Sequence, residues 1–213
     1  MRMGLLIILL STASAASSDE EIRVVDTRQL PVGPAGAGAS HELRLSLNLF
    51  RGGRWSEQQV AAAILESAGL LRQCGVSIVR AELRVVQAPP RFHVYFTPLS
   101  RELLARLPAS RPAVFFVDDT RNDPAFDAEA IGRENAAGRP ELADTVWVAY
   151  GARDLGQALA HELVHLLSDS GAHSDAPGNL MRPETSPADT ALTPAQCARL
   201  RAKGEANGLL RVN

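Results

Sequence analysis

The sequence predicts a single α+β domain built around a twisted mixed sheet, and three observations lead to this prediction. The chain has 213 residues, 46% of them hydrophobic, which suits one globular domain with a core of its own. Segments typical of strands and segments typical of helices are interspersed along it. No internal repeat of about 20 to 50 residues is apparent, which argues against solenoids and propellers.

The first fifteen residues have the three parts of a secretory signal peptide. Arg2 gives the basic start, residues 4–10 form an apolar run, and Ala13-Ser14-Ala15 is a small-residue cleavage site. The run is too short to anchor the chain in a membrane, and a buried N-terminal strand is the alternative interpretation. We therefore expect a secreted or periplasmic protein that loses residues 1–15 and has no membrane association afterwards.

Residues 16–40 are expected to form a flexible N-terminal segment. Residues 31–40, PVGPAGAGAS, are a Pro-, Gly- and Ala-rich tract typical of a linker. The polar segment before this tract is expected to be a disordered N-terminus. The folded domain is accordingly predicted to span residues 41–213.

Strands and helices follow one another through this domain. The predicted strands are short runs with alternating, β-branched or aromatic residues, and they cover residues 42–50, 76–86, 92–96, 113–117 and 145–150. The predicted helices have capping residues or Ala- and Leu-rich faces, and they cover residues 56–73, 100–107 and 154–168. A last helix is expected to begin at the cap Thr193 with Pro194 in its first turn, and to end before Gly204 or Gly208.

A long polar stretch, residues 118–142, separates two of the predicted strands. Loops of this length in compact domains are usually functional or disordered. Its acidic residues could bind calcium, but they lack the alternating spacing and the Gly turn of a calcium loop. We therefore expect a solvated loop at the four acids Asp118, Asp119, Asp123 and Asp127.

Charge and cysteine content limit the partners and the compartment. The net charge is −2, and the 22 basic residues are scattered, so nucleic acid is not an expected partner. We expect a monomer. In an oxidising compartment Cys74 and Cys197 can form one disulfide, although two unpaired buried thiols are also compatible with the sequence.

Residues 161–165 read HELVH and carry the chemistry. On a helix His161 and His165 lie one turn apart, so both imidazoles can face one ion. Glu162 lies about 100° around the helix, close enough to take a proton from a metal-bound water but poorly placed to act as a ligand. Catalytic zinc usually has three protein ligands and an open position, so a third ligand is expected after the helix.

The segment HELVHLLSDSGAHSDAPGNLM resembles the metzincin superfamily of zinc peptidases. In that family the HExxH motif continues through a Gly turn to a third His and then to a Met-containing turn. The resemblance implies that the zinc ligands are His161, His165 and His173. It also implies that Glu162 is the general base, that Gly171 forms the bend, and that Met181 lies beneath the metal.

One spacing departs from the family pattern. His173 follows His165 by eight residues, whereas the family has six, so two residues are inserted before the third ligand. The insertion brings the role of Gly171 into question. It also leaves Asp169 and Asp175 as alternative third ligands.

The resemblance implies a zincin-like fold, with the active-site helix and the C-terminal helix packed on the sheet. It also implies a protein or peptide substrate that lies extended along an edge strand.

Two other interpretations stay open. In a gluzincin-like peptidase the third ligand is a carboxylate, for which Glu184 is the candidate. In a non-catalytic zinc-binding module a fourth protein ligand closes the site, although the presence of Glu162 argues against this.

Overall fold

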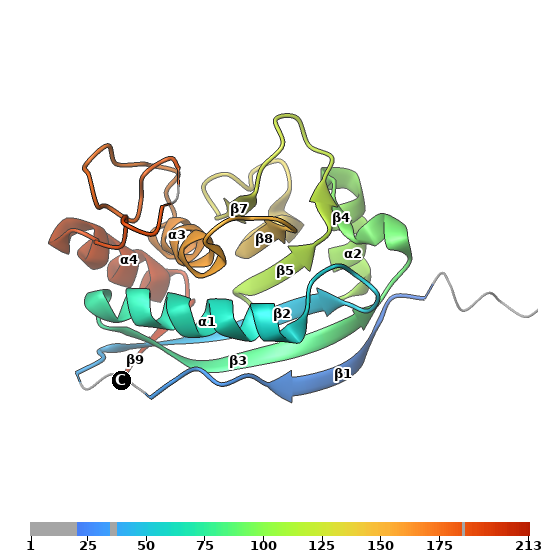
Figure 1. Cartoon of the computed structure of the whole chain (residues 1–213), viewed down its shortest axis with the longest axis horizontal. Helices are drawn as coiled ribbons and strands as arrows, with labels where there is room; N and C mark the ends of the chain where they lie inside the picture. Colours follow the sequence, from blue (N-terminus) through green and yellow to red (C-terminus); the bar gives the residue numbers. More distant parts are fainter. Residues whose placement is uncertain (1–20, 35–37, 185) are drawn as a thin grey trace, which may run out of the picture.

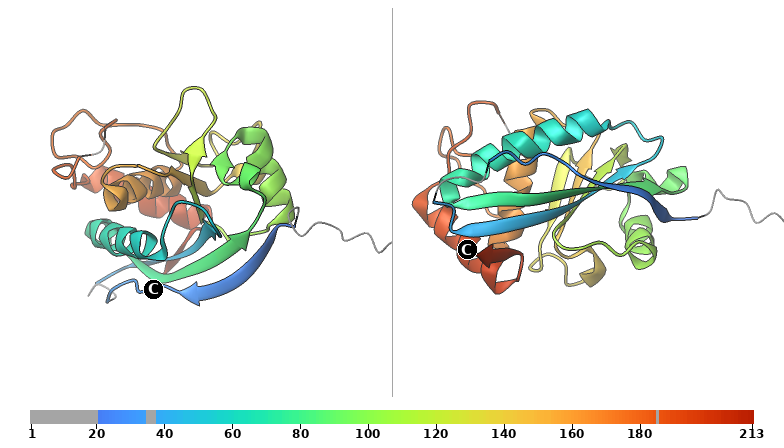
Figure 2. Two further views of the ribbon diagram at one scale, coloured as in Figure 1. Left: turned by 45° about the vertical axis from the view of Figure 1, so that its right-hand side comes forward. Right: turned by 90° about the horizontal axis from the view of Figure 1, so that it is seen from below.

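The computed structural model describes residues 21–34, 38–184 and 186–213. The predicted signal peptide, residues 1–15, lies outside the described residues. The fold is a mixed α/β fold in which helices pack on a twisted seven-stranded sheet, as Figures 1 and 2 show. The strand order is β1-β3-β2-β5-β8-β7, and β9 also pairs with β2.

The sheet has a parallel centre and antiparallel edges. Strands β3, β2, β5 and β8 run parallel to one another, while β1, β7 and β9 pair antiparallel with their neighbours. The strands of this sheet are β1 (Arg23–Gln29), β2 (His41–Phe50), β3 (Val76–Gln87), β5 (Ala113–Val117), β7 (Ala128–Ile131), β8 (Thr145–Ala149) and β9 (Leu210–Val212). A separate parallel pair consists of β4 (Val94–Tyr95) and β6 (Asp119–Thr120).

The described residues contain four α-helices, which are α1 (Glu57–Leu71), α2 (Thr97–Arg106), α3 (Leu155–Ser168) and α4 (Pro194–Ala206). The expected caps begin two of them. Ser56 forms a capping box with Gln59 at α1, and Thr193 forms one with Gln196 at α4, so backbone N–H groups of each first turn are satisfied. None of these helices is both long and apolar enough to cross a membrane.

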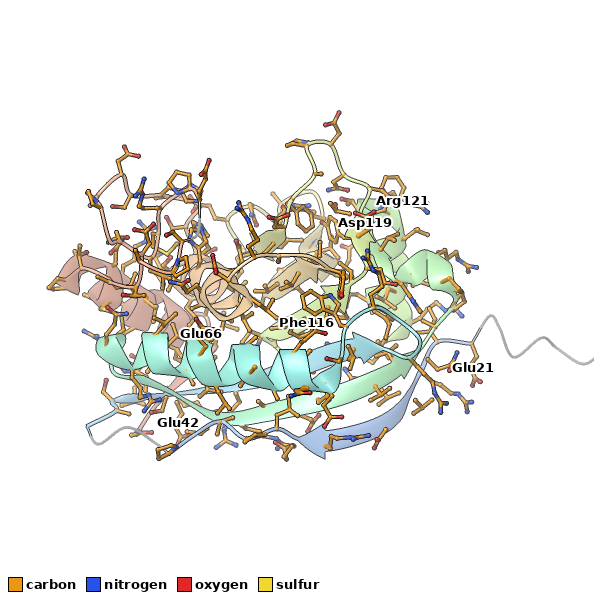
Figure 3. All side chains as sticks on the ribbon, viewed as in Figure 1. Glu21, Glu42, Glu66, Phe116, Asp119 and Arg121 are labelled. Atoms are coloured by element: carbon orange, nitrogen blue, oxygen red, sulfur yellow. A yellow bond between two sulfur atoms is a disulfide. The ribbon has the colours of Figure 1, made fainter. Side chains whose placement is uncertain are left out.

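Each face of the sheet has its own apolar core. Strand residues alternate between the two faces, so in β5 Val114 and Phe116 join one core whereas Phe115 joins the other. The first core lies under α1, α3 and α4, and the second lies under α2. Phe116 is completely enclosed between the sheet and the helices (Figure 3). The site helix α3 is thus supported by a packed layer.

Three strands correct the sequence prediction. Residues 23–29 form the edge strand β1 rather than a flexible segment, because their backbone pairs with β3. The polar stretch 118–142 is not a loop throughout, since it contains β7, which pairs with β8. Strand β9 was not predicted and pairs with the start of β2. In each case pairing with a neighbouring strand stabilises a segment whose own composition is a weak signal.

Two boundaries also differ. The predicted strand over 92–96 is reduced to Val94–Tyr95, because Pro90–Phe92 forms a 3₁₀ turn. Helix α2 begins at Thr97, with Pro98 in its first turn, where proline is favoured.

The expected disulfide is present between Cys74 and Cys197, with their Cα atoms 4.8 Å apart. It joins the 3₁₀ turn after α1 (Arg72–Cys74) to α4.

The contact between α1 and α3 depends on Gly156. Ser67 Oγ lies 2.8 Å from the Gly156 carbonyl oxygen, and Glu66 extends from α1 toward α3 (Figure 3). A Cβ at Gly156 would lie 2.5 Å from Glu66 Cβ, a distance that moving the end of the Glu66 side chain cannot relieve.

We therefore expect Gly156→Ala to lower the free energy of unfolding by about 1–3 kcal/mol, despite the better helix propensity of alanine. Urea denaturation measures this change. Gly138→Ala is the matched control, because a Cβ there meets nothing within 4 Å. Equal stability of the two variants would contradict the close contact.

Candidate metal centre and cleft

Helix α3 presents two histidines on one face. His161 and His165 are one turn apart, and their Nε2 atoms are separated by 2.8 Å. His161 is buried and His165 is half-buried. The predicted i, i+4 arrangement therefore exists, and it directs two imidazole nitrogens toward one point.

Backbone carbonyls fix the tautomers of both rings. Nδ1 of His161 lies 2.8 Å from the carbonyl oxygen of Leu180, and Nδ1 of His165 lies 2.7 Å from that of Ser170. A carbonyl oxygen only accepts, so each Nδ1 carries a proton and donates. Each neutral ring then offers the lone pair of Nε2, which is the usual arrangement of metal-ligating histidines.

His173 completes the cluster from the loop after α3. Its Nε2 lies 3.2 Å from Nε2 of His165, and the ligand atoms of His161, His165 and His173 all lie within 4.8 Å of one another. The next residue fixes the loop, because the Ser174 N–H donates to the Met181 carbonyl at 2.8 Å. Lone pairs converging this closely repel one another, so a shared cation would stabilise the arrangement.

The two histidines of α3 are in the protonation state that a metal ligand requires. Burial, opposed by the hydrogen bond to Leu180, lowers the pKa of His161. Burial is the largest cause that lowers the pKa of His165 to about 4, and the charge of His161 is the second. Both imidazoles are therefore neutral near pH 7, which is the form that binds metal ions.

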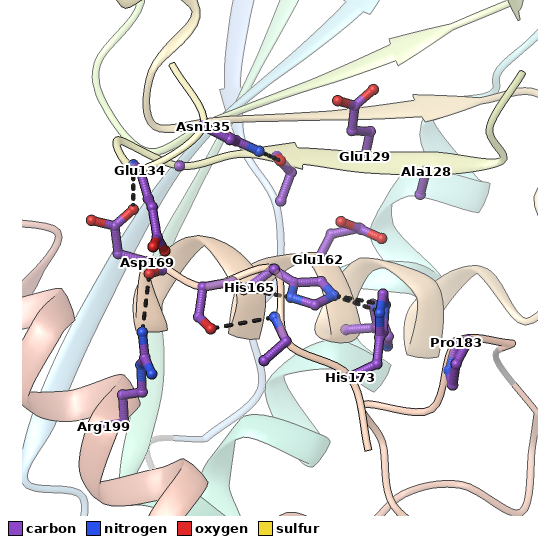
Figure 4. A pocket seen from close by; sticks show the side chains of 16 residues that line it. Ala128, Glu129, Glu134, Asn135, Glu162, His165, Asp169, His173, Pro183 and Arg199 are labelled. Atoms are coloured by element: carbon purple, nitrogen blue, oxygen red, sulfur yellow. Dashed lines mark hydrogen bonds between the residues drawn. The ribbon is translucent and has the colours of Figure 1, made fainter. Parts of the chain in front are cut away.

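Glu162 lies beside this cluster in a cleft between α3 and β7. Its side chain points from α3 toward the strand (Figure 4), and the pocket of about 710 Å³ is lined by all three histidines, by Glu162 and by Ala128–Ala130 of β7. Burial raises the pKa of Glu162 to about 8, while a hydrogen bond from the Ala130 backbone lowers it. The cleft thus holds a carboxyl group whose affinity for protons is high.

A turn beneath His161 orients its ring, and the sequence motifs did not identify the polar residues of this turn. Asn179 Oδ1 accepts from the Met181 N–H at 2.9 Å, and Asp189 Oδ1 accepts from the Gly178 N–H at 2.9 Å. Both polar side chains are buried. The turn positions the Leu180 carbonyl beneath His161, and Met181 itself is buried in the core. The dipeptide Pro177-Gly178 is the turn signal that could have pointed to it.

The bend after α3 is at Asp169, which corrects the expectation for Gly171. Asp169 has φ 45° and ψ 59°, in the left-handed region that aspartate tolerates better than most residues. Gly171 does not adopt a positive φ. The helix therefore ends before the residue that the resemblance indicated.

The alternative ligands lie outside the cluster formed by the described residues. The Asp169 carboxylate accepts a hydrogen bond from the Glu134 N–H, and Asp175 and Glu184 are exposed. His41 contacts Ser40, and His93 is stacked on Phe50. Within the described ranges, the metal-binding arrangement of three or more His, Cys, Asp or Glu residues is the one formed by the three site histidines, so the acids of residues 118–127 form no such group.

Comparisons with known proteins bear on the fold. No protein-family model matches the chain, and no curated protein matches it. The crystal structure of metalloproteinase-II from Bacteroides fragilis is similar, with a TM-score of 0.56 and 17% sequence identity, over 83% of this chain and 57% of that one. This chain therefore spans less than two thirds of the length of that protein. The two share a fold.

Proposed function

We propose that this protein is a secreted zinc-dependent endopeptidase of the metzincin kind, with His161, His165 and His173 as zinc ligands and Glu162 as general base. The observation that carries the proposal is the convergence of three Nε2 atoms beside a carboxyl group at the floor of a cleft. The fold shared with a metalloproteinase supports it. The buried Met181 and the disulfide support the metzincin likeness and the secreted location.

The donor set fits zinc. Tetrahedral zinc with Zn–N bonds of about 2.0–2.1 Å separates its ligand nitrogens by about 3.3 Å. Nε2 of His165 lies 2.8 Å from Nε2 of His161 and 3.2 Å from Nε2 of His173. Three protein ligands leave a position open, as in catalytic sites. When bound, zinc supplies a Lewis acid that polarises a carbonyl group and acidifies a water molecule.

Glu162 acts on protons at this position. Its carboxylate takes a proton from the attacking water and returns it to the nitrogen of the leaving amine. Burial gives this carboxyl group a raised pKa, so it both accepts and releases a proton near neutral pH. The positive charge of a bound zinc ion would lower the pKa of Glu162 again, so that Glu162 would be ionised and able to accept a proton when the substrate arrives.

The proposed substrate class follows from β7, which forms the wall of the cleft opposite α3. Strand β7 is the last strand at its side of the sheet and lines the pocket with Ala128–Ala130. An edge strand offers unpaired backbone groups that an extended peptide can pair with. The proposed substrate is therefore a protein or peptide bound in extended form along β7, with its scissile carbonyl above the three histidines.

Metal analysis combined with a cleavage assay tests this function. We expect purified mature protein to contain one zinc ion per chain and to cleave members of an unbiased peptide library. A chelator should abolish cleavage, and added zinc should restore it. One zinc ion without any cleavage would favour the non-catalytic binding module, and absence of zinc would refute the proposed metal centre.

A further inference from the structure

The residue that ends α3 also contacts the opposite wall of the cleft. Asp169 adopts a left-handed conformation, where glycine is the least strained residue. A side chain at this position therefore needs a compensating contact. The Asp169 carboxylate provides one, because its Oδ1 accepts from the Glu134 backbone N–H at 2.9 Å (Figure 4).

Gly132 leaves space for this contact. A Cβ built on Gly132 would lie 2.9 Å from Asp169 Oδ1, which is closer than real Cβ atoms approach an oxygen. The backbone of Gly132 does not have a positive φ, so an alanine there would be opposed by the Asp169 carboxylate, which would have to move, rather than by the backbone. The two residues are complementary across the cleft.

The contacted loop, residues 132–135, is the direct continuation of β7. Asn135 Nδ2 donates to the Ala130 carbonyl oxygen at 3.2 Å, so the loop folds back onto the strand. From the other side, Arg199 of α4 donates to the carbonyl oxygens of Ser168 and Asp169 at 3.1 Å and 3.3 Å. The end of α3 is thereby held by α4 and connected through one carboxylate to the strand that borders the cleft.

We propose that Asp169 is a positioning residue that fixes β7 relative to the histidine cluster. Its carboxylate holds the loop 132–135 against the end of α3. Together with Arg133, which donates to Asp144 and Asn207, and with the pairing of β7 to β8, it sets the height of the edge strand above α3. This inference rests on the proposed function for its effect on substrate, because the strand that Asp169 holds is the one that pairs with the peptide. The carboxylate does not contact the three histidines, so metal binding does not depend on it.

Four variants separate the carboxylate from the backbone turn. Asp169→Gly keeps the left-handed turn and removes the carboxylate, whereas Asp169→Asn keeps an acceptor oxygen in a residue that tolerates the turn. Gly132→Ala displaces the carboxylate by contact. The double variant Gly132→Ala/Asp169→Gly removes that contact again, so the two substitutions should not add.

Hydrogen–deuterium exchange of residues 130–135, zinc content and the kinetics of peptide cleavage are then compared. In Asp169→Gly we expect exchange at Glu134 to be faster by about tenfold or more. KM should rise severalfold, kcat should change less than about twofold, and zinc content should stay at the wild-type value. Asp169→Asn should behave like wild type, Gly132→Ala like Asp169→Gly, and the double variant no worse than either.

Wild-type exchange in Asp169→Gly, or additive effects in the double variant, would overturn the positioning role. Loss of zinc in Asp169→Gly would also overturn it, because the residue would then support the metal ligands. If the wild-type protein cleaves no peptide, the proposed function fails, while the exchange data and the double variant still decide whether Asp169 holds β7.

Discussion

Replacing His161 with alanine is expected to abolish both zinc binding and peptide cleavage. His161 is the most buried of the three site histidines, and its ring is oriented by the Leu180 carbonyl. Loss of an outer-shell partner alone typically weakens metal binding by about 10- to 100-fold, so loss of the ligand itself should exceed this. Competition with a chromophoric chelator measures the affinity directly.

The matched control for this substitution is His41→Ala. His41 lies in β2, where its ring contacts Ser40, and it does not line the cleft. Its replacement should leave zinc affinity unchanged. If the His161 variant retained one tightly bound zinc ion and wild-type cleavage, the proposed metal centre would be refuted.

Replacing Glu162 with glutamine should remove turnover while zinc remains bound. Glutamine keeps the size of the side chain but cannot accept a proton, so the variant loses only the general base. Positioned general bases contribute about 10²- to 10⁴-fold to rate, and we expect kcat to fall within this range. Measuring kcat and zinc content on the same preparation separates the two properties.

Glu102→Gln, on α2, is the control for the loss of a carboxylate at a distance from the cleft. It should retain full activity. A fully active Glu162→Gln enzyme would show that another group takes the proton. A zinc-free Glu162→Gln protein would instead assign Glu162 to the metal centre.

The sequence predicted the elements that depend on local signals. The N-caps Ser56 and Thr193 and the continuous apolar run of β5 are such signals, and the structure confirms these elements. Strand β7 could not be predicted, because AEAI has weak strand propensity and owes its conformation to β8. The same holds for β1, which lies beside β3 only after the chain has folded.

The residues of the candidate site likewise include some that local sequence signals predict and some that they do not. The spacing of His161 and His165 is set by one helix, so the sequence could predict their meeting. His173 is brought to them by an irregular loop, whose path is fixed by hydrogen bonds such as those of Asn179 and Asp189 rather than by a helical period. For this reason the sequence left the third position open between a histidine and two aspartates. The bend at Asp169 was missed because its stabilising partner, Glu134, is 35 residues away.

The crosslink between Cys74 and Cys197 also acts on the unfolded protein. The two residues are 123 positions apart, and the covalent ring that they close contains all of α3, the turn after it and each residue of the proposed site. An oxidised unfolded chain therefore cannot separate these segments freely, and the chain-entropy model assigns such a ring about 5 kcal/mol. A molecule that unfolds transiently with this disulfide intact therefore searches fewer conformations before the three histidines meet again.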